Sequence, residues 1–254
     1  MTFVVTKTFN TEKNARTKPI FCLKVAESDQ EIEECLKLRY AVFAGEVGSR
    51  LRPNDANVDH DRFDPYCQHL MVVDSKTRKV IATTRLLMVE GATQAGSFAS
   101  QTEFDLSRIL SQEGRFMEVG KTCIHPYFRN GSVVTLLWQG IAGVIAQHHI
   151  DFLFSCGSIS LRHGDSYVNS VMHYLRDTHY SSSALRVRPR IPLPKNTAPT
   201  TDDVVLPTLI KTYLHQGALV CGEPHWDAEF SLATLFLLLN TESMPSRYPG
   251  YWLT

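Results

Sequence analysis

The sequence predicts an α/β domain built around one mixed sheet, and three observations support this fold class. Segments of strand-like composition alternate along the chain with segments whose apolar residues recur at helical spacing. Residues 151–159 show almost no polar alternation, as expected for a strand in the centre of a sheet that is covered on both faces. Residues 132–149 are apolar on most faces, which indicates a buried helix.

The first half of the chain is predicted to form a polar N-terminal arm, one clear helix and several strands. Residues 1–19 are the arm, and residues 46–67, rich in Asp, Asn, Arg and Pro, are predicted to be a long loop. Ser28 and Glu31 have capping-box spacing, which marks the start of the helix. In chain order the predicted elements are a strand at 21–28, a helix at 28–46, strands at 69–74 and 79–89, a helix start within 100–110 and a strand at 116–124.

The second half is predicted to alternate helices and strands around one loop insertion. Residues 181–203, rich in Pro, Ser and Arg, form the insertion. The predicted elements are helices at 132–149 and 165–179, a strand at 151–159, a short helix at 206–218, a strand at 219–224, and a last strand or short buried helix at 230–240. We therefore expect a single domain over residues 20–254.

Composition excludes several classes of protein. The 26 Lys and Arg balance the 26 Asp and Glu, so no general attraction to nucleic acid is expected. The six cysteines are scattered without a CxxC pair, which argues against a zinc site and favours a reducing compartment. No apolar run reaches the roughly 18 residues of a spanning helix. We expect a cytoplasmic protein, with peripheral contact at the inner membrane face left open.

The segment from residue 116 to residue 138 is a strand, a short loop and the start of a helix. A helix N-terminus presents backbone N–H groups that bind anions. Arg129 adds a positive charge, and Gly131 permits close approach to the backbone. These features favour a phosphate or pyrophosphate ligand, but an ordinary strand–helix loop explains the segment about as well.

Glu118 lies in the middle of that strand, where strand propensity disfavours a carboxylate. Half-buried, it would serve as a general base; the alternative is a glutamate at an edge or facing solvent. Lys121 would lie on the other face of a regular strand, and a bulge at Gly120 would bring both charges to one face.

Three other kinds of charged or reactive residue stand in unusual places. Asp59, Asp61 and Asp64 in the long loop fit either a cationic substrate or a solvated acidic turn. Arg85 lies in an apolar strand and needs a partner, which Asp61, Asp64 or Glu118 would supply. Arg39 lies on the apolar stripe of the first helix, either extending its charged head to solvent or turned inward toward a site.

Cys156 is the only cysteine whose surroundings, "FSCGS", invite interpretation as a nucleophile. No dedicated base precedes it, so a buried structural thiol is the better explanation. The histidines at 69, 125 and 163 lack the spacing of a metal site, and we predict no metal.

Taken together, several segments resemble one known family, the ornithine lipid-type N-acyltransferases, which are hemolysin-like proteins with a GNAT-type fold. The resemblance covers roughly residues 30–253. The segments that carry it are LRYAVFAGEVG, DHDRFDPYCQHLMVVD, VIATTRLL, EVGKTCIHPYFRNGSVVTLLWQGIA, LFSCGSIS, LPTLIKTYLHQGALVCGEPHWDAEFSLATLFLLLN and RYPGYWL. It implies a GNAT-like, mostly antiparallel central sheet flanked by helices, with a C-terminal extension.

The family is itself similar to the acyl-homoserine-lactone synthases, whose motif residues match this chain in order. An Arg-x-x-x-Phe on the first helix is matched by Arg39 and Phe43, and an Asp-x-x-Asp in the next loop by Asp61 and Asp64. Arg85 matches a strand arginine. A Glu-x-x-Arg is matched only in part, because Lys121 follows Glu118, and lysine lacks the planar fork of arginine.

The resemblance implies an amide-forming N-acyltransferase that needs no cofactor and moves a long-chain acyl group from acyl-acyl carrier protein, or acyl-CoA, to an amino acid such as ornithine. A signal synthase, or acylation of another amine such as glycine, is the alternative, and a membrane-binding protein without activity is a weaker third. The implied roles are catalysis for Glu118 and Arg85, substrate binding for Arg39, Phe43, Asp61, Asp64 and Lys121, and donor binding for Arg129, Gly131, Ser132 and Trp138.

Overall fold

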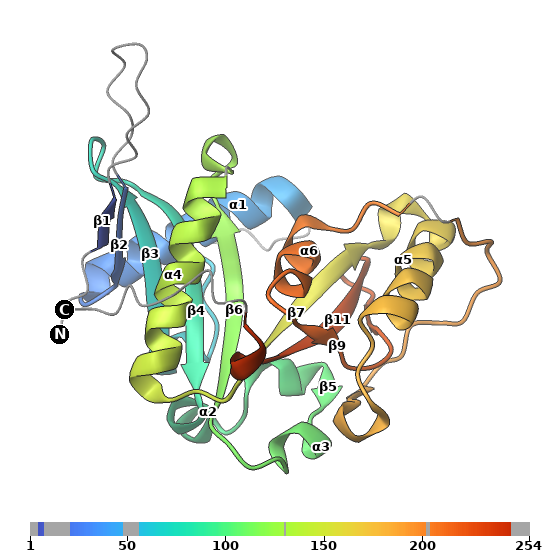
Figure 1. Ribbon diagram of the computed structural model, residues 1–254. Coiled ribbons are helices and arrows are strands. Elements are labelled where there is room, and N and C mark those ends of the chain that lie inside the picture. The colour runs from blue at the N-terminus through green and yellow to red at the C-terminus, as the bar shows by residue number, and fades with distance from the viewer. Residues whose placement is uncertain (1–4, 8–20, 48–55, 130, 202–203, 245–254) are drawn as a thin grey trace. The chain divides into compact units, whose positions relative to one another are not determined.

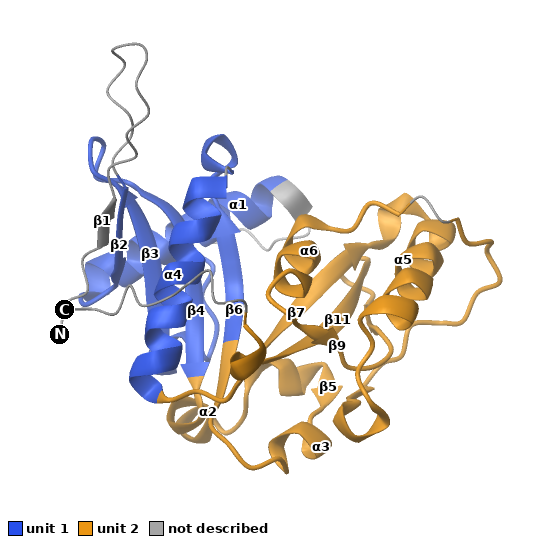
Figure 2. Cartoon of the chain, viewed as in Figure 1, with its two compact units in different colours: residues 1–87, 119–148, 248–254 blue, residues 88–118, 149–247 orange. Residues whose placement is uncertain are grey.

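The structure is a computed structural model, and it describes residues 5–7, 21–47, 56–129, 131–201 and 204–244. The chain divides into two compact units (Figure 2). Unit 1 comprises residues 1–87, 119–148 and 248–254, and unit 2 comprises residues 88–118 and 149–247. Strand β6 (Phe116–Ile124) belongs to both, because its first three residues fall in unit 2 and the others in unit 1.

Unit 1 is a layered α/β unit in which antiparallel strands are followed by β6 (Figure 1). Its other elements are β1 (Val5–Lys7), β2 (Phe21–Val25), α1 (Asp29–Val47), the 3-10 turn η2 (Asp64–Tyr66), β3 (Gln68–Asp74), β4 (Val80–Met88), the 3-10 turn η4 (Pro126–Phe128) and α4 (Gly131–His148). Hydrogen bonding links the strands in the order β1-β2-β3-β4-β6.

Successive side chains of a strand point to opposite sides of the sheet, and in β3 the side chains on both sides are buried. Val72 belongs to a core cluster with Leu136 and Leu137 of α4, whereas its neighbours Met71 and Val73 pack with Cys35 of α1. Helix α4 approaches the sheet closely. A Cβ atom at Gly140 would come within 3.1 Å of methyl groups of Leu23 and Leu70. The two helices therefore enclose the sheet of unit 1.

Unit 2 is organised around a long antiparallel pair of strands. β11 (Leu232–Asn240) pairs with β7 (Phe152–Ser160) along the full length of both strands. The remaining elements are α2 (Val89–Ala95), η3 (Ala99–Thr102), β5 (Phe104–Asp105), α3 (Ser107–Leu110), η5 (Leu161–His163), α5 (Asp165–Thr178), η6 (Ser183–Leu185), β8 (Arg188–Pro189), α6 (Thr208–Leu214), β9 (Leu219–Val220), β10 (His225–Asp227) and η7 (Thr241–Ser243).

The first three residues of β6 complete the sheet of unit 2. They pair in parallel with Phe152–Phe154 of β7, so that Glu118 lies opposite Phe154. β9 and β10 pair antiparallel with β11, and β5 forms a separate two-stranded sheet with β8. The predicted fold class, a mixed and mostly antiparallel sheet with flanking helices, is confirmed. From the family resemblance we also predict that the strands at 116–124 and 151–157 splay apart to admit a pantetheine arm, and this stays a prediction.

One local prediction needs a correction in position. The helix start predicted within 100–110 lies at Ser107, where α3 begins, and not at Ser100, which has capping-box spacing to Glu103. Residues Ala99–Thr102 form the turn η3 instead, and the Gln101 side chain accepts from the Phe98 N–H at 2.8 Å. The capping box predicted at the start of α1 is confirmed. Ser28 Oγ accepts from the Glu31 N–H, and the Glu31 carboxylate accepts from the backbone N–H groups of Ser28 and Glu27.

Three predicted segments are only partly described. Of the arm at 1–19, the structure describes residues 5–7, which form β1, and the remainder lies outside the described residues. The long loop at 46–67 is described from residue 56, and the insertion at 181–203 up to residue 201. The single-domain organisation stays a prediction. No helix in the described part of the chain combines the length and apolar character needed to span a bilayer.

Candidate active site

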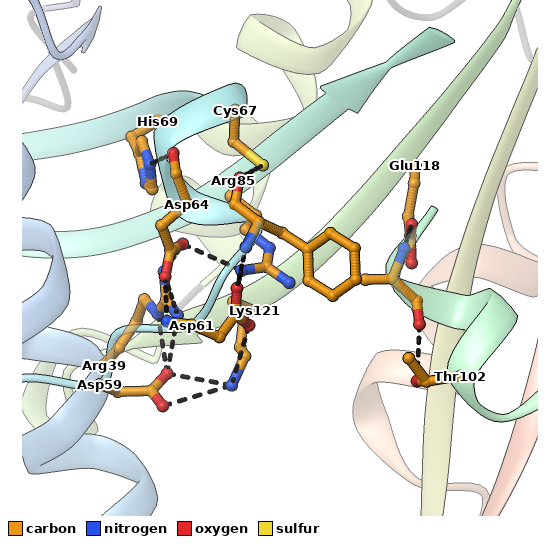
Figure 3. Close-up of polar contacts among 12 residues, drawn as sticks. Arg39, Asp59, Asp61, Asp64, Cys67, His69, Arg85, Thr102, Glu118 and Lys121 are labelled. Atoms are coloured by element: carbon orange, nitrogen blue, oxygen red, sulfur yellow. Dashed lines mark hydrogen bonds and ion pairs between the residues drawn. The ribbon is translucent and has the colours of Figure 1, made fainter. Parts of the chain in front are cut away.

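Six charged side chains of unit 1 form one interconnected network, called here the charged cluster (Figure 3). Its members are Arg39 of α1, Asp59 and Asp61 of the loop before β3, Asp64 of η2, Arg85 of β4 and Lys121 of β6. Segments far apart in the sequence thus meet through three carboxylates and three basic side chains. The inward orientation of Arg39 and the pairing of Arg85 with loop aspartates are both confirmed.

Asp64 is the centre of the charged cluster and is only 3% exposed. Its Oδ1 accepts from Arg39 Nη1 at 2.6 Å and from Arg85 Nη1 at 2.9 Å. Its Oδ2 accepts from Arg39 Nη2 at 3.3 Å and from the Asp61 N–H at 2.7 Å. Both oxygens are therefore engaged, in the bidentate geometry that makes guanidinium–carboxylate pairs strong.

Electrostatics fix the ionisation of this centre. Burial alone would raise the pKa of Asp64, but Arg39 and Arg85 outweigh it and hold that pKa at about 2. Burial likewise opposes ionisation of Asp61, and Arg85 outweighs it, so the pKa of Asp61 is lowered. The pKa of Arg85 is raised despite burial, because Asp61 and Asp64 stabilise its charge. At neutral pH these groups form buried ion pairs.

The more accessible side of the charged cluster is formed by Asp61 and Lys121, whose side chains are 31% and 30% exposed. Lys121 Nζ lies 3.1 Å from Asp59 Oδ2 and 5.5 Å from the centroid of the Phe43 ring. Lys121 also has a positive φ of 52°, which is uncommon for a lysine inside a strand. The strand is thus irregular at Lys121, one residue beyond the bulge predicted at Gly120.

Glu118 is the buried carboxylate of unit 2, with 6% exposure, so its interpretation as a solvent-facing residue is wrong. Its Oε2 accepts from the N–H of Ala99 at 2.7 Å and its Oε1 from the N–H of Ser100 at 2.9 Å. Both donors belong to the turn η3. Their hydrogen bonds replace those to water that the carboxylate loses on burial, and they fix its orientation.

The thiol of Cys156 has no character of a nucleophile. Burial raises its pKa well above the usual value, and the nearby carboxylates of Glu103 and Glu118 raise it further. A thiol in such surroundings stays protonated and unreactive, which supports the interpretation of Cys156 as structural. Tyr213 of α6 is buried in the same neighbourhood, and burial raises its pKa. Sequence reasoning missed Tyr213 because its helix resembles any other apolar helix.

The predicted donor-binding residues follow β6. Helix α4 begins at Gly131, one residue before its predicted start at Ser132. Arg129 precedes it, and its Nε donates to the Ile124 carbonyl at 3.1 Å. Trp138 is buried and forms part of the core of unit 1. Residue 130 lies outside the described residues. A role of these residues in donor binding stays a prediction.

The sequence-predicted residues therefore fall into two groups. Arg39, Asp61, Asp64 and Arg85 converge in unit 1, and Glu118 lies in unit 2 with its own partners. We also predict that all five converge in one cavity, and this stays a prediction. The backbone donors of η3, Ala99 and Ser100, had no sequence pattern to reveal them.

Comparison with known proteins shows which fold this architecture has. A model of the acetyltransferase (GNAT) domain family matches residues 38–139. The solved structure of the AHL synthase LasI superposes with a TM-score of 0.54 at 13% identity, covering 93% of this chain and 98% of that one, which shows a shared fold. The chain has the fold of the GNAT-type acyltransferases.

Relatives in sequence define the family more narrowly. The L-ornithine N(alpha)-acyltransferase of Brucella abortus is 31% identical over 91% of this chain and 88% of its own length. The enzyme of that name from Rhodobacter capsulatus is 29% identical over 91% of this chain and 93% of its own. The chain belongs to the L-ornithine N(alpha)-acyltransferase family.

Proposed function

We propose that the protein transfers a long-chain acyl group, 3-hydroxyacyl groups included, from acyl carrier protein to the α-amine of ornithine, giving a lyso-aminolipid. Similarity to L-ornithine N(alpha)-acyltransferases along nearly the whole chain supports the acceptor. The observation that carries the chemistry is Glu118, a buried carboxylate fixed at both oxygens by backbone N–H groups.

Amide formation from a thioester requires a neutral amine, a positioned carbonyl and a donor for the oxyanion. In the proposed step Glu118 takes a proton from the amine, directly or through one water. The amine nitrogen then bonds to the thioester carbon and the carbon–sulfur bond breaks. The proton held by Glu118 passes to the departing sulfur, so that the donor leaves as a thiol and the carboxylate is restored. No covalent enzyme intermediate forms, in agreement with the protonated Cys156.

Acceptor recognition is assigned to the accessible side of the charged cluster. Ornithine carries a second amine, and the carboxylate of Asp61, which keeps an exposed face, suits that ammonium group. Lys121, held beside Phe43, suits the substrate carboxylate. Arg39, Asp64 and Arg85 are largely engaged with one another, so their part is to hold Asp61 and the loop in place. On this proposal Arg85 acts through Asp61.

The donor is assigned to the start of α4. The positive end of the helix dipole at the start of α4 and a neighbouring arginine suit the phosphate of phosphopantetheine. An acyl carrier protein is acidic, so a basic surface beside the donor would receive it. Charge reversal in the Arg129→Glu variant should then raise the apparent KM for acyl-carrier protein far more than for a short acyl-pantetheine, and the difference should shrink at high salt. Equal loss with both donors would mean that Arg129 contacts the phosphopantetheine itself.

The direct test offers the purified protein a 3-hydroxyacyl-carrier protein with L-ornithine, L-lysine, glycine or S-adenosylmethionine, and identifies products by mass spectrometry. We expect Nα-acyl-ornithine as the main product. Acyl-glycine or an acyl-homoserine lactone as the main product would replace the proposed acceptor by the corresponding alternative. The likeness to LasI does not favour the lactone, because at 13% identity it shows the fold alone.

A further inference from the structure

The carboxylate of Glu118 is held by a small built assembly in unit 2 rather than by a single contact. We propose that the turn η3 and Arg190 of the insertion position Glu118 for proton transfer, so that the insertion controls the rate of the chemical step. This inference rests on the proposed role of Glu118 as general base. Arg190 is assigned here as a positioning residue, acting on Glu118 through η3.

The first layer of the assembly is the pair of N–H groups. Ala99 and Ser100 are consecutive, and each donates to a different oxygen of Glu118, at 2.7 Å and 2.9 Å. Two donors on one rigid backbone fix the plane of the carboxylate as well as its position. Phe98 fastens this turn to the strands, because its ring packs edge-on against Phe154, 4.9 Å between centroids, and Phe154 lies opposite Glu118.

The second layer closes the turn and connects it to the insertion. The Gln101 side chain accepts from the N–H of Phe98 at 2.8 Å. The Gln101 carbonyl in turn accepts from Arg190 Nε at 2.6 Å, and the backbone N–H of Arg190 donates to the Glu103 carbonyl at 2.8 Å. Arg190 therefore holds η3 at its C-terminal end while Phe98 holds it at the other.

The neighbouring arginine of the insertion is placed differently. Arg188 lies two residues earlier in β8. Both arginines are exposed, but within the described residues the guanidinium of Arg188 donates no hydrogen bond, whereas that of Arg190 donates to Gln101. From composition alone both arginines would be assigned the same role, that of basic groups on a surface that receives an acidic carrier protein. Arg190 is committed to η3, and Arg188 keeps its charge at the surface, where a docking partner would meet it.

Replacement of Ala99 by proline removes one donor to Glu118 with little other change. Ala99 is the first residue of η3, where proline is favoured, and Phe98 has the extended backbone (φ −71°, ψ 155°) that a following proline requires. The matched control is Ser183→Pro at the first residue of the turn η6, which follows Ser182 with φ −61° and ψ 159°. Ser183 is exposed and far in sequence from Glu118.

We expect Ala99→Pro to lower kcat about tenfold with KM nearly unchanged, as loss of a charge-assisted hydrogen bond to the reacting group predicts. The acid limb of the pH–rate profile should move to higher pH, because a donor to the ionised carboxylate is lost. Ser183→Pro should leave both unchanged. In a Glu118→Gln background, Ala99→Pro should have almost no further effect, since the two residues act as one unit.

Arg190→Gln provides a second test if Ala99→Pro does not fold. This variant should lower kcat equally with acyl-carrier protein and with a short acyl-pantetheine as donor. Arg190→Lys should restore part of the rate. Arg188→Gln should lower the rate only when acyl-carrier protein is the donor. If Glu118→Gln is inactive while Ala99→Pro and Arg190→Gln keep the wild-type kcat and pH profile, the positioning role of η3 and Arg190 is wrong. The proposed role of Glu118 as general base then still stands. If Glu118→Gln itself retains full kcat, the proposed function of Glu118 fails, and the positioning role fails with it.

Discussion

Two buried carboxylates, Asp64 in unit 1 and Glu118 in unit 2, have opposite kinds of partner. Asp64 is held by the guanidinium groups of Arg39 and Arg85, which carry full charges. Glu118 is held by backbone N–H groups, which are formally neutral. A carboxylate between two guanidiniums is a poor base, because protonation would leave two buried cations without a counter-charge. Neutral N–H donors also favour the ionised carboxylate, but protonation of a carboxylate that they hold leaves no buried cation behind.

The comparison teaches that burial alone does not identify a catalytic carboxylate. Asp64 is at least as deeply buried as Glu118, yet its geometry is that of a structural ion pair. The identity of the partners separates the two roles. On this basis substitution of Glu118 should affect the reaction most, and substitution of Asp64 should affect folding most.

Glu118→Gln should give the largest effect on the reaction. Removal of a general base typically costs about 10²- to 10⁴-fold in rate, and we expect kcat for Nα-acyl-ornithine formation to fall within that range. The amide also places an NH₂ group against one backbone N–H, so the free energy of unfolding should fall by about 1–3 kcal/mol. Rates measured at 25 °C on protein shown by circular dichroism to be folded would check this; a loss below tenfold would contradict it.

Asp64→Asn should give the largest effect on stability. Loss of one partner from a buried ion pair costs about 3–5 kcal/mol, because the remaining charges stay buried without compensation. The matched control is Glu33→Gln, whose exposed pair with Lys37 on α1 should contribute less than about 0.5 kcal/mol. Urea unfolding of both variants would measure the difference. Equal destabilisation by the two substitutions would mean that the centre of the charged cluster is not structural.

Acid pH should weaken the same ion pairs, and the loss of stability should be smaller than that caused by Asp64→Asn. The pKa of Asp64 is 3.8 when exposed and about 2 in the fold, so its ionised form is favoured by folding. Its contribution is complete above pH 4 and is lost as the pH falls from about 4 to 2, and the change in pKa corresponds to about 2 kcal/mol. His69, whose pKa burial lowers, adds a loss that begins nearer pH 6.5. Unfolding free energies at pH 4.5, 3.5 and 2.5 should fall less steeply for Asp64→Asn than for wild type.

Local pattern was enough to predict the long elements of the fold. β6, β7, α4 and α5 lie within a residue or two of their predicted bounds, because strand and helix periods are expressed over nine or more residues. The segment at 230–240 was ambiguous between helix and strand, and pairing with β7 decides it as β11. The seven-residue helix α2 and the three-residue strand β10 were missed, because they are too short to show a period.

The site was predictable where side chains meet side chains. An arginine in an apolar strand needs an acidic partner, and Arg85 has two of the three that were predicted. The donors to Glu118 were not predictable, because a backbone N–H is present at every residue and η3 lies 18 residues away in sequence. The contact of Arg190 with η3 was equally unpredictable from composition, since its neighbour Arg188 has the same side chain and makes no such contact.

Cys156→Ala should give the smallest effect, and it tests whether the surroundings of Glu118 contain a second reactive group. Burial and the carboxylates of Glu103 and Glu118 keep the thiol protonated, so it takes no part in the proposed direct transfer. We expect kcat and KM to change less than about twofold, while the lost sulfur contacts cost about 1 kcal/mol of stability. Mass spectrometry of the wild-type protein during turnover should show no acyl group on Cys156. A large loss of kcat together with an acylated Cys156 would replace direct transfer by a covalent route, and Glu118 would then serve the thiol instead of the amine.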